Sequence, residues 1–209
     1  MGSVAARHLA VAFAAAVVLT VVPAANAGLV SGLVGAALPS CGSTTRPFAQ
    51  FGDGGSYCTL RNNGFENGSA GWTLSGGASV VADNEPWFVN GPGRSALDLP
   101  PGASATSSPV PISLLDPYFR LFARSSAADG ALRVQILFRG LTGNLTGVLN
   151  ASDLSPSDYA SWEPSGYVAS LLALPLGTSS AQVVVTSRAG SGDWEIDDVF
   201  VDPWLNRIG

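Results

Sequence analysis

Short segments of alternating apolar and polar residues follow one another along most of this chain. In residues 132–139 every second position is Leu, Val, Ile or Phe, and the positions between them are Arg, Gln, Leu and Arg. Residues 118–124 alternate in the same way, with Phe119, Leu121 and Ala123 on one side and Tyr118, Arg120, Phe122 and Arg124 on the other. A period of two residues predicts β-strands that bury one face.

Further short strands are predicted where β-branched or alternating segments stand between turn residues. They cover residues 78–82, 87–89, 95–99, 145–149, 167–174, 182–187 and 194–201. Residues 103–112 contain Pro109 and Pro111, which restricts this segment to an edge strand or an irregular segment. Asp129-Gly130 and residues 140–144 are expected as hairpin turns, and residues 150–157 as a loop or one helical turn after Ser152. Many short strands without a long helix predict an all-β, two-sheet antiparallel β-sandwich or jelly roll.

The N-terminus has the features of a secretory signal peptide. An apolar segment from Leu9 to Val22 follows Arg7 and His8, and Ala25-Asn26-Ala27 is an A-x-A cleavage site. We therefore expect residues 1–27 to be removed and the mature protein to be secreted. An uncleaved membrane anchor is the alternative, but Pro23 and Gly28 interrupt the apolar run, so no stable membrane insertion is expected after cleavage. Residues 28–56 are expected as an N-terminal loop segment and residues 57–209 as the sandwich domain.

Two residue types that serve many enzymes are scarce or absent. The chain has no Lys, and its one His, His8, lies in the predicted signal peptide. This excludes Ser-His-Asp and Cys-His catalysis, histidine metal ligands and lysine Schiff bases in the mature protein. The formal net charge of −5 argues against nucleic acid as a partner.

Cys41 and Cys58 are the only cysteines. In an exported chain we expect them to form a disulfide, which stabilises a loop of this length by about 3 kcal/mol. A reactive or metal-binding pair is the alternative interpretation.

The two ends of the predicted domain carry its most specific motifs. Residues 60–72 read LRNNGFENGSAGW and residues 193–202 read DWEIDDVFVD, and we expect the two segments to lie together. Strict alternation places Asp197 on the face of Val199 and Val201, which are expected core residues. A buried carboxylate needs a cation or a metal. Glu66 and Asp197 are thus candidate ligands of one hard-cation site, and an all-oxygen site suits Ca²⁺. Salt-bridged or solvated carboxylates are the alternative.

These two motifs resemble the carbohydrate-binding modules of the galactose-binding-domain-like jelly-roll superfamily. More narrowly, the chain resembles a group of uncharacterised secreted actinobacterial proteins that are built on this module. The resemblance implies a structural calcium held by Glu66 and Asp197, a core position for Trp72, and a polysaccharide or glycan as partner. The binding aromatics of the family move between members, so the resemblance assigns none of them.

A sugar site needs flat aromatic faces and planar polar side chains. We expect one sheet face to present Tyr118, Arg120, Arg124, Arg133, Gln135 and Arg139, with Trp87 and Trp162 on loop rims beside it. The predicted ligand-binding residues are Trp87, Tyr118, Arg120, Arg133, Gln135 and Trp162. The alternative is a solvated face with buried tryptophans.

The sequence therefore predicts a non-catalytic carbohydrate-binding module with no catalytic residues. A cell-surface or matrix protein-interaction sandwich without a sugar groove is the second hypothesis. A small glycoside hydrolase is the third, because that chemistry needs only two carboxylates, for instance among Glu85, Glu163 and Glu195.

Overall fold

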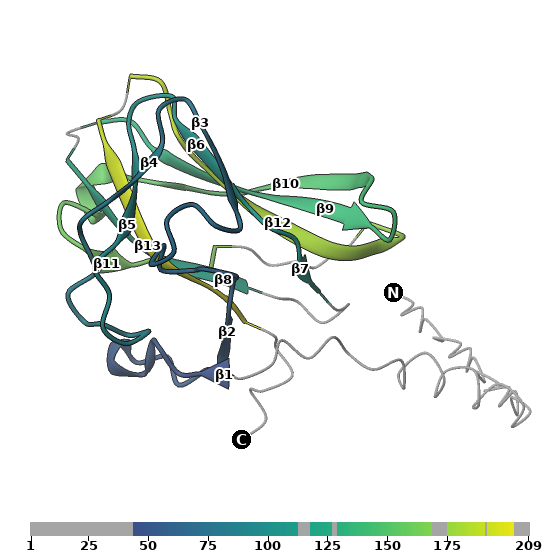
Figure 1. The fold of residues 1–209 in the computed structure, drawn as a ribbon, viewed down its shortest axis with the longest axis horizontal. Coiled ribbons are helices and arrows are strands. Elements are labelled where there is room, and N and C mark those ends of the chain that lie inside the picture. The colour runs from purple at the N-terminus through teal and green to yellow at the C-terminus, as the bar shows by residue number, and fades with distance from the viewer. Residues whose placement is uncertain (1–43, 113–117, 127–128, 169–174, 191, 203–209) are drawn as a thin grey trace, which may run out of the picture. The chain divides into compact units, whose positions relative to one another are not determined.

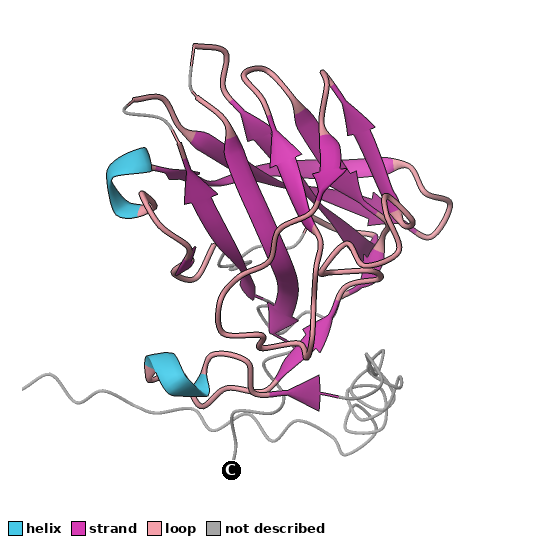
Figure 2. Ribbon diagram, turned by 60° about the vertical axis from the view of Figure 1, so that its left-hand side comes forward, coloured by secondary structure: helices cyan, strands magenta, loops and turns pink. Residues whose placement is uncertain are grey.

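A computed structural model describes residues 44–112, 118–126, 129–168, 175–190 and 192–202. The strands form two antiparallel sheets packed as a jelly-roll sandwich, which confirms the predicted fold class (Figures 1 and 2). The predicted signal peptide and Cys41 lie outside the described residues, as does most of the predicted strand 167–174. None of the described helices is long and apolar enough to cross a membrane.

The first sheet, sheet A, is built around the C-terminal strand β13 (Trp194–Asp202). On one side β13 pairs with β8 (Tyr118–Ser125), whose other edge holds β11 (Glu163–Pro164). On the other side it pairs with β2 and β5, which lead on to β1 and β4. Their bounds are β1 (Thr44–Thr45), β2 (Tyr57–Thr59), β4 (Ser79–Val81) and β5 (Ala96–Leu99).

The second sheet, sheet B, has the order β10-β9-β12-β6-β3, with β7 beside β12. Its strands are β3 (Trp72–Ser75), β6 (Ser104–Ser107), β7 (Val110–Pro111), β9 (Leu132–Gly140), β10 (Leu145–Leu154) and β12 (Thr178–Ser187). Two short 3-10 helices, η2 (Ala49–Phe51) and η3 (Pro156–Asp158), are cyan in Figure 2.

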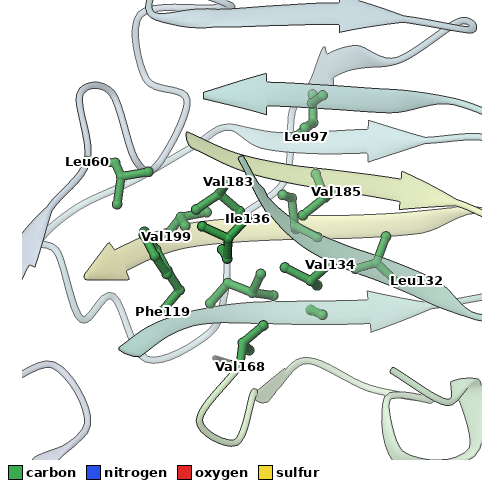
Figure 3. Close-up of a cluster of buried hydrophobic side chains, with 14 of the residues drawn as sticks. Leu60, Leu97, Phe119, Leu132, Val134, Ile136, Val168, Val183, Val185 and Val199 are labelled. Atoms are coloured by element: carbon green, nitrogen blue, oxygen red, sulfur yellow. The ribbon is translucent and has the colours of Figure 1, made fainter. Parts of the chain in front are cut away.

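The main core lies between the sheets, where the inward residues of both are fully buried (Figure 3). Val134 and Ile136 of β9 and Val183 and Val185 of β12 come from sheet B, and Phe119 of β8 comes from sheet A. Full burial of such a side chain stabilises the fold by about 1.5–3 kcal/mol. The alternating segments therefore form strands because only that conformation puts every second residue into this core.

The two ends of the domain meet as predicted. In β2, Cys58 pairs with Val201 of β13, and the backbone N–H of Leu60 donates to the carbonyl of Val199 at 3.4 Å. Further along, the N–H of Val199 donates to the carbonyl of Asn63 at 3.2 Å. The loop after β2 thus lies directly against β13.

Strand β13 is irregular in its middle, which the strict alternation did not predict. Its register against β8 shifts between Asp197 and Phe200, and Asp198 has a positive φ of 46°. This bulge reverses the phase, so Ile196 and Val199 both enter the main core although two residues, and not one, stand between them. The predicted common face for Asp197, Val199 and Val201 is therefore wrong.

A second apolar cluster covers the outer face of sheet A. Phe48, Tyr57, Phe122 and Phe200 are fully buried there, and the ring of Phe48 stacks on that of Phe122 at 5.3 Å between centroids. Residues 44–56, expected as a loop, contain β1 and η2 and supply Phe48. The central strands of sheet A are consequently buried on both faces.

The two turn predictions in the middle of the chain had different outcomes. Residues 140–144 join β9 to β10 as a hairpin, as predicted, with Gly140 donating its N–H to the carbonyl of Asn144 at 2.9 Å. Strand β10 continues to Leu154, however, where a loop or one helical turn was expected from residue 150, and the short helix η3 follows at Pro156–Asp158. The segment around Asp129 is not a hairpin turn, because β8 lies in sheet A and β9 in sheet B.

Candidate functional site

The six predicted ligand-binding residues do not share one sheet face. Tyr118 and Arg120 lie on β8 in sheet A, whereas Arg133 and Gln135 lie on β9 in sheet B. The cause is the connection between β8 and β9, which crosses from one sheet to the other. The alternation correctly identified two outward faces but could not show that they belong to different sheets.

The two tryptophans expected on loop rims pack with the second apolar cluster. Trp87 is half-buried, and its ring lies 4.9 Å from that of Phe51 and 5.5 Å from that of Phe122. Trp162 is 8% exposed and belongs to the same cluster. The rim position predicted for Trp162 is therefore wrong, whereas Trp87 packs against Phe51 and Phe122 and keeps part of its surface exposed.

Arg120 is buried and holds the N-terminal segment on sheet A. Its Nη1 donates to Asp53 at 2.8 Å, its Nε donates to the carbonyl of Ser165 at 2.8 Å, and its guanidinium lies 3.9 Å from the ring centroid of Phe48. Burial raises the pKa of Asp53. Hydrogen bonds from Tyr57, Gly55 and Arg120 together lower this pKa by more than burial raises it, so it lies below its usual value. This network explains Arg120 as a structural residue.

Tyr118 of β8 lies beside Tyr167 in the segment that follows β11, with 5.0 Å between ring centroids. Tyr118 is half-buried and Tyr167 is 52% exposed. Of the six predicted residues, only Arg133 and Gln135 therefore lie on a broad, solvent-facing sheet surface.

The outer face of sheet B is a polar surface. Along β9 and β12, every second residue is buried and the residues between are half-exposed. The outward residues of β9 and β12 include Arg133, Gln135, Arg139 and Gln182. This pattern contrasts with sheet A, where the described residues of β13 are buried on both faces except Glu195, which is half-exposed.

Hydrogen bonds hold these side chains in fixed orientations. Arg133 donates two hydrogen bonds to the two carboxylate oxygens of Asp153, at 3.0 and 3.3 Å. Next to it, Gln135 Nε2 donates to Asn150 Oδ1 at 2.7 Å. The hydrogen bond from Arg133 lowers the pKa of Asp153, so this carboxylate is charged at neutral pH. A shallow cavity of about 170 Å³ lies among Arg133, Asn150, Ser152 and Asp153.

Asn150 and Asp153 were missed by the sequence reasoning because their segment was expected to be a loop. The alternation that would mark this segment as a strand is weak, because β10 contains bulges near Thr146 and Ala151 that break its period of two. The aromatic residues within the described strands of sheet B, Trp72 and Phe138, both point into the core. This face is therefore suited to hydrogen bonding and has no stacking platform of its own.

The predicted metal ligands lie where β13 meets two loops. Asp197 is fully buried; its Oδ2 accepts the backbone N–H of Glu85 at 3.1 Å, and its Oδ1 accepts that of Asp198 at 2.8 Å. Glu66 is exposed, and its Oε1 accepts the backbone N–H groups of Arg94 and Ser95 at 2.7 and 2.8 Å. Asp197 is thus buried as expected, but among the loops that cover sheet A and not in the main core.

Two further carboxylates join Asp197. Glu85 is fully buried and accepts the backbone N–H groups of Trp87 and Val89, each at 2.6 Å. Asp198 is 4% exposed, and its Oδ1 lies 3.5 Å from the Nδ2 of Asn63. The bulge in β13 is the reason why consecutive residues, Asp197 and Asp198, are both buried here.

The electrostatics of this cluster are unfavourable for charged carboxylates. Burial, followed by the charge of Asp198, raises the pKa of Asp197 to about 9. Burial, followed by the charge of Glu85, raises the pKa of Asp198 to about 7, and the charge of Glu66 adds to this. In the described part of the chain, no Arg forms an ion pair with any of these four residues. The cluster therefore needs protons or a bound cation to be stable.

The oxygen-only donor set fits a hard cation such as Ca²⁺. Within the described ranges, however, no three acidic, cysteine or histidine side chains converge as a metal-binding group. Carbonyl and amide oxygens of the loops would have to complete the coordination of an ion held by Glu66 and Asp197. Gly64 marks how tight this region is, since a Cβ there would lie 2.7 Å from Asp198 Oδ1.

Comparison with known proteins identifies similar folds only. No protein-family model matches the sequence, and no curated protein matches it either. Solved structures with a similar fold include a family 16 carbohydrate-binding module (TM-score 0.49, 16% identity, covering 68% of this chain and 98% of that one). The C-terminal family 22 carbohydrate-binding module of Clostridium thermocellum Xyn10B is another (TM-score 0.48, 13% identity, 72% and 96%).

A third similar structure is TmCBM61 in complex with beta-1,4-galactotriose (TM-score 0.41, 20% identity, covering 69% of this chain and 97% of that one). Longer chains also match, and this chain spans 21% of the bacteriophage CBA120 tailspike protein 4 domain and 27% of an α-L-arabinofuranosidase. With these TM-scores below 0.5, the function has to be argued from the residues of this chain.

Proposed function

We propose that this protein binds carbohydrate without catalysing a reaction, and that the glycan lies on the outer face of sheet B. The observation that carries the proposal is the row of planar polar side chains on β9 and β10, held in place by the Arg133–Asp153 and Gln135–Asn150 hydrogen bonds. Sugar hydroxyls both donate and accept hydrogen bonds. A preorganised row of guanidinium, amide and carboxylate groups offers partners for both.

The same surface continues onto the neighbouring strand β12. Arg139 Nε donates to Gln182 Oε1 at 2.8 Å, and the Nε2 of Gln182 donates to the carbonyl of Ser107 at 2.7 Å. The side chains therefore lose little conformational entropy when a ligand arrives, which favours binding. Because the face lacks an aromatic platform, recognition would rest on hydrogen bonds, and we expect weak affinity for any single sugar unit.

A non-catalytic role agrees with the chemistry of this face. Its carboxylate, Asp153, is held by Arg133 and has a lowered pKa, which is opposite to the raised pKa of a general acid. The alternative hydrolase carboxylates lie in different surroundings. Glu85 is fully buried, Glu163 is exposed on the edge strand β11, and Glu195 is paired with Arg124.

Affinity electrophoresis against a panel of soluble polysaccharides tests the proposal. We expect at least one polysaccharide to retard the protein, and Gln135→Ala to reduce that retardation. The matched control is Glu163→Gln, which changes an exposed residue in sheet A. Equal retardation of both variants and the parent protein would place binding elsewhere and contradict the assignment to sheet B.

We further propose that Glu66 and Asp197 hold a structural Ca²⁺. The support is the buried carboxylate cluster without a cationic side chain, in which a divalent ion would offset the repulsion between Asp197, Asp198 and Glu85. Thermal unfolding should shift to lower temperature when a chelator is added, and Asp197→Asn should remove that shift. An unchanged melting temperature in chelator would refute the calcium site.

A protein partner is the second candidate function, and one feature favours it. Leu141 in the β9–β10 hairpin loop is 93% exposed, and Leu176 is 99% exposed. The two loops are neighbours, since a Cβ on Gly147 of β10 would lie 2.7 Å from Pro175. Replacing Leu141 and Leu176 together by Ser should leave polysaccharide binding intact if sheet B binds glycan. Loss of binding in this variant would instead implicate the hairpin end.

A further inference from the structure

A cavity of about 310 Å³ opens on sheet A, away from the polar face of sheet B. Its walls include Asp98 of β5, Arg124 of β8 and Glu195 of β13, together with Asp193 in the segment that leads into β13. The volume lies at the lower end of the range for small-ligand sites in proteins, which is roughly 300–1,000 Å³. A single saccharide unit is therefore the scale of ligand that it can enclose.

Three of these residues form one row across the sheet. In the strand register, Glu195 lies directly opposite Arg124 on one side and directly opposite Asp98 on the other. Two like charges in directly opposite positions destabilise a sheet. The Glu195–Asp98 pair therefore does not stabilise the sheet, and we look for its role in the cavity.

The single cation in the cavity wall is already engaged. Arg124 forms ion pairs with Glu195 and with Asp83, the latter at 2.5 Å. Within the described part of the chain, neither Asp98 nor Asp193 forms an ion pair. Burial, followed by the charge of Asp193, raises the pKa of Asp98. The wall thus carries three carboxylates and one guanidinium, that of Arg124, which also pairs with Asp83 outside the wall.

A buried donor without an acceptor lies next to this wall. Trp162 is 8% exposed, and the guanidinium carbon of Arg124 lies 5.3 Å from its ring centroid. Among the described residues, the Nε1 of Trp162 has no hydrogen-bond partner. This N–H is enclosed by protein and Trp162 does not line the cavity, so its ring bears on the cavity only through its contact with the guanidinium of Arg124.

The uncompensated charge points to a cation, and the surroundings point to an organic one. Ser125 and Ser126 line the cavity together with the guanidinium of Arg124. Hydroxyl and guanidinium groups beside the carboxylates suit a ligand that carries both an ammonium group and oxygen atoms. A sugar with a free amino group has this chemistry.

We propose that the cavity between Asp98, Asp193 and Glu195 binds the ammonium group of an amino sugar. This proposal rests on the proposed function, since it names the class of saccharide that the protein distinguishes. The ammonium group would lie between Asp98 and Asp193, which have no cationic partner, and Arg124 and the serines would contact ring oxygens and hydroxyls.

The test compares two ligands with the same sugar backbone, one with charged amino groups and one with neutral acetamido groups. Isothermal titration at about pH 6, below the usual pKa of an α-amino group, would use a β-1,4-linked glucosamine tetramer and its fully N-acetylated counterpart. We expect the glucosamine tetramer to bind at least tenfold more tightly. Asp98→Asn should reduce this preference to less than threefold. Asp193→Asn, at an exposed position, repeats the test if Asp98→Asn fails to fold.

Two control variants separate the possible explanations. Glu163→Gln removes an exposed carboxylate that does not line the cavity, and it should keep the preference. Gln135→Ala on sheet B, away from the cavity, should keep the preference as well. Equal affinity for the two tetramers, or an equal loss in Glu163→Gln and Asp98→Asn, would overturn the cavity proposal. Binding of neutral polysaccharide without any preference would overturn the cavity alone, whereas no binding of any saccharide would overturn the proposed function as well.

Discussion

Replacing Asp197 by Asn should change how the stability of the protein depends on pH. In the folded protein, burial and the neighbouring Asp198 raise the pKa of Asp197 to about 9, from an ordinary value of 3.8. Between these two values, the folded form holds a proton that the unfolded form releases. The unfolding free energy must therefore fall as pH rises through this window, and it falls by about 1.4 kcal/mol per pH unit for one proton.

From about pH 5 to about pH 8, this single group should lower the stability of metal-free protein by about 4 kcal/mol. Asn cannot titrate, so Asp197→Asn should remove that part of the slope. The variant also loses one of the two backbone hydrogen bonds that the carboxylate accepts, which costs about 1 kcal/mol at low pH. The variant should be slightly less stable than the parent at about pH 5 and clearly more stable at about pH 8.

Urea denaturation over this pH range, in excess chelator, measures the slope directly. Asp129→Asn, which changes an exposed residue, is the control and should leave the slope unchanged. In excess Ca²⁺ the parent protein should lose less stability toward high pH, because calcium binds the deprotonated carboxylates. Equal slopes for the parent and Asp197→Asn in chelator would show that Asp197 is ionised in the fold, and the reasoning from burial would fail.

Two further substitutions test the packing around the candidate sites. Gly64→Ala should lower the free energy of unfolding by about 1–3 kcal/mol in chemical denaturation, because the new Cβ would lie 2.7 Å from Asp198 Oδ1. Gly54→Ala is the control, since there is open space around its Cβ, and it should leave the stability unchanged. Arg120→Ala should lower the free energy of unfolding by about 2–4 kcal/mol, because it leaves Asp53 without its buried partner. It should also increase proteolysis of residues 46–56. Unchanged proteolysis would mean that Arg120 does not hold this segment on sheet A.

Much of the fold follows from the sequence because the core uses a simple period. Strands β8 and β9 alternate strictly, and the structure buries the apolar residue at every second position of β9. The alternation identifies which side of a strand is buried, but not which sheet the strand joins. That is why Arg120 and Arg133 were expected on one face and lie on different sheets.

The phase of β13 is the clearest local failure. A bulge adds one residue to a strand and leaves no strong mark in the sequence, so the alternation was continued through Asp198. The consecutive carboxylates of Asp197 and Asp198 are the only hint, because strict alternation would expose one of them. Glu85 was equally hidden, since its burial depends on a loop that folds back to donate two backbone N–H groups.

The sequence pattern alone does not show that the N-terminal segment packs on the outer face of sheet A. Residues 44–56 are rich in Gly and lack a period, yet Phe48 is fully buried among Phe122 and Phe200. Several aromatic residues on the outward side of β8 and β13 are a signal that something covers them. The same signal explains why Trp162 is buried and Trp87 packs against this cluster.

The most direct test of the account is to map polysaccharide binding by amide chemical-shift changes in NMR spectra. With a polysaccharide that retards the protein in electrophoresis, we predict that the largest changes fall on β9, β10 and β12, including the side-chain amides of Gln135 and Asn150. Changes confined to sheet A, or a complete absence of changes with every polysaccharide, would contradict carbohydrate binding by the outer face of sheet B.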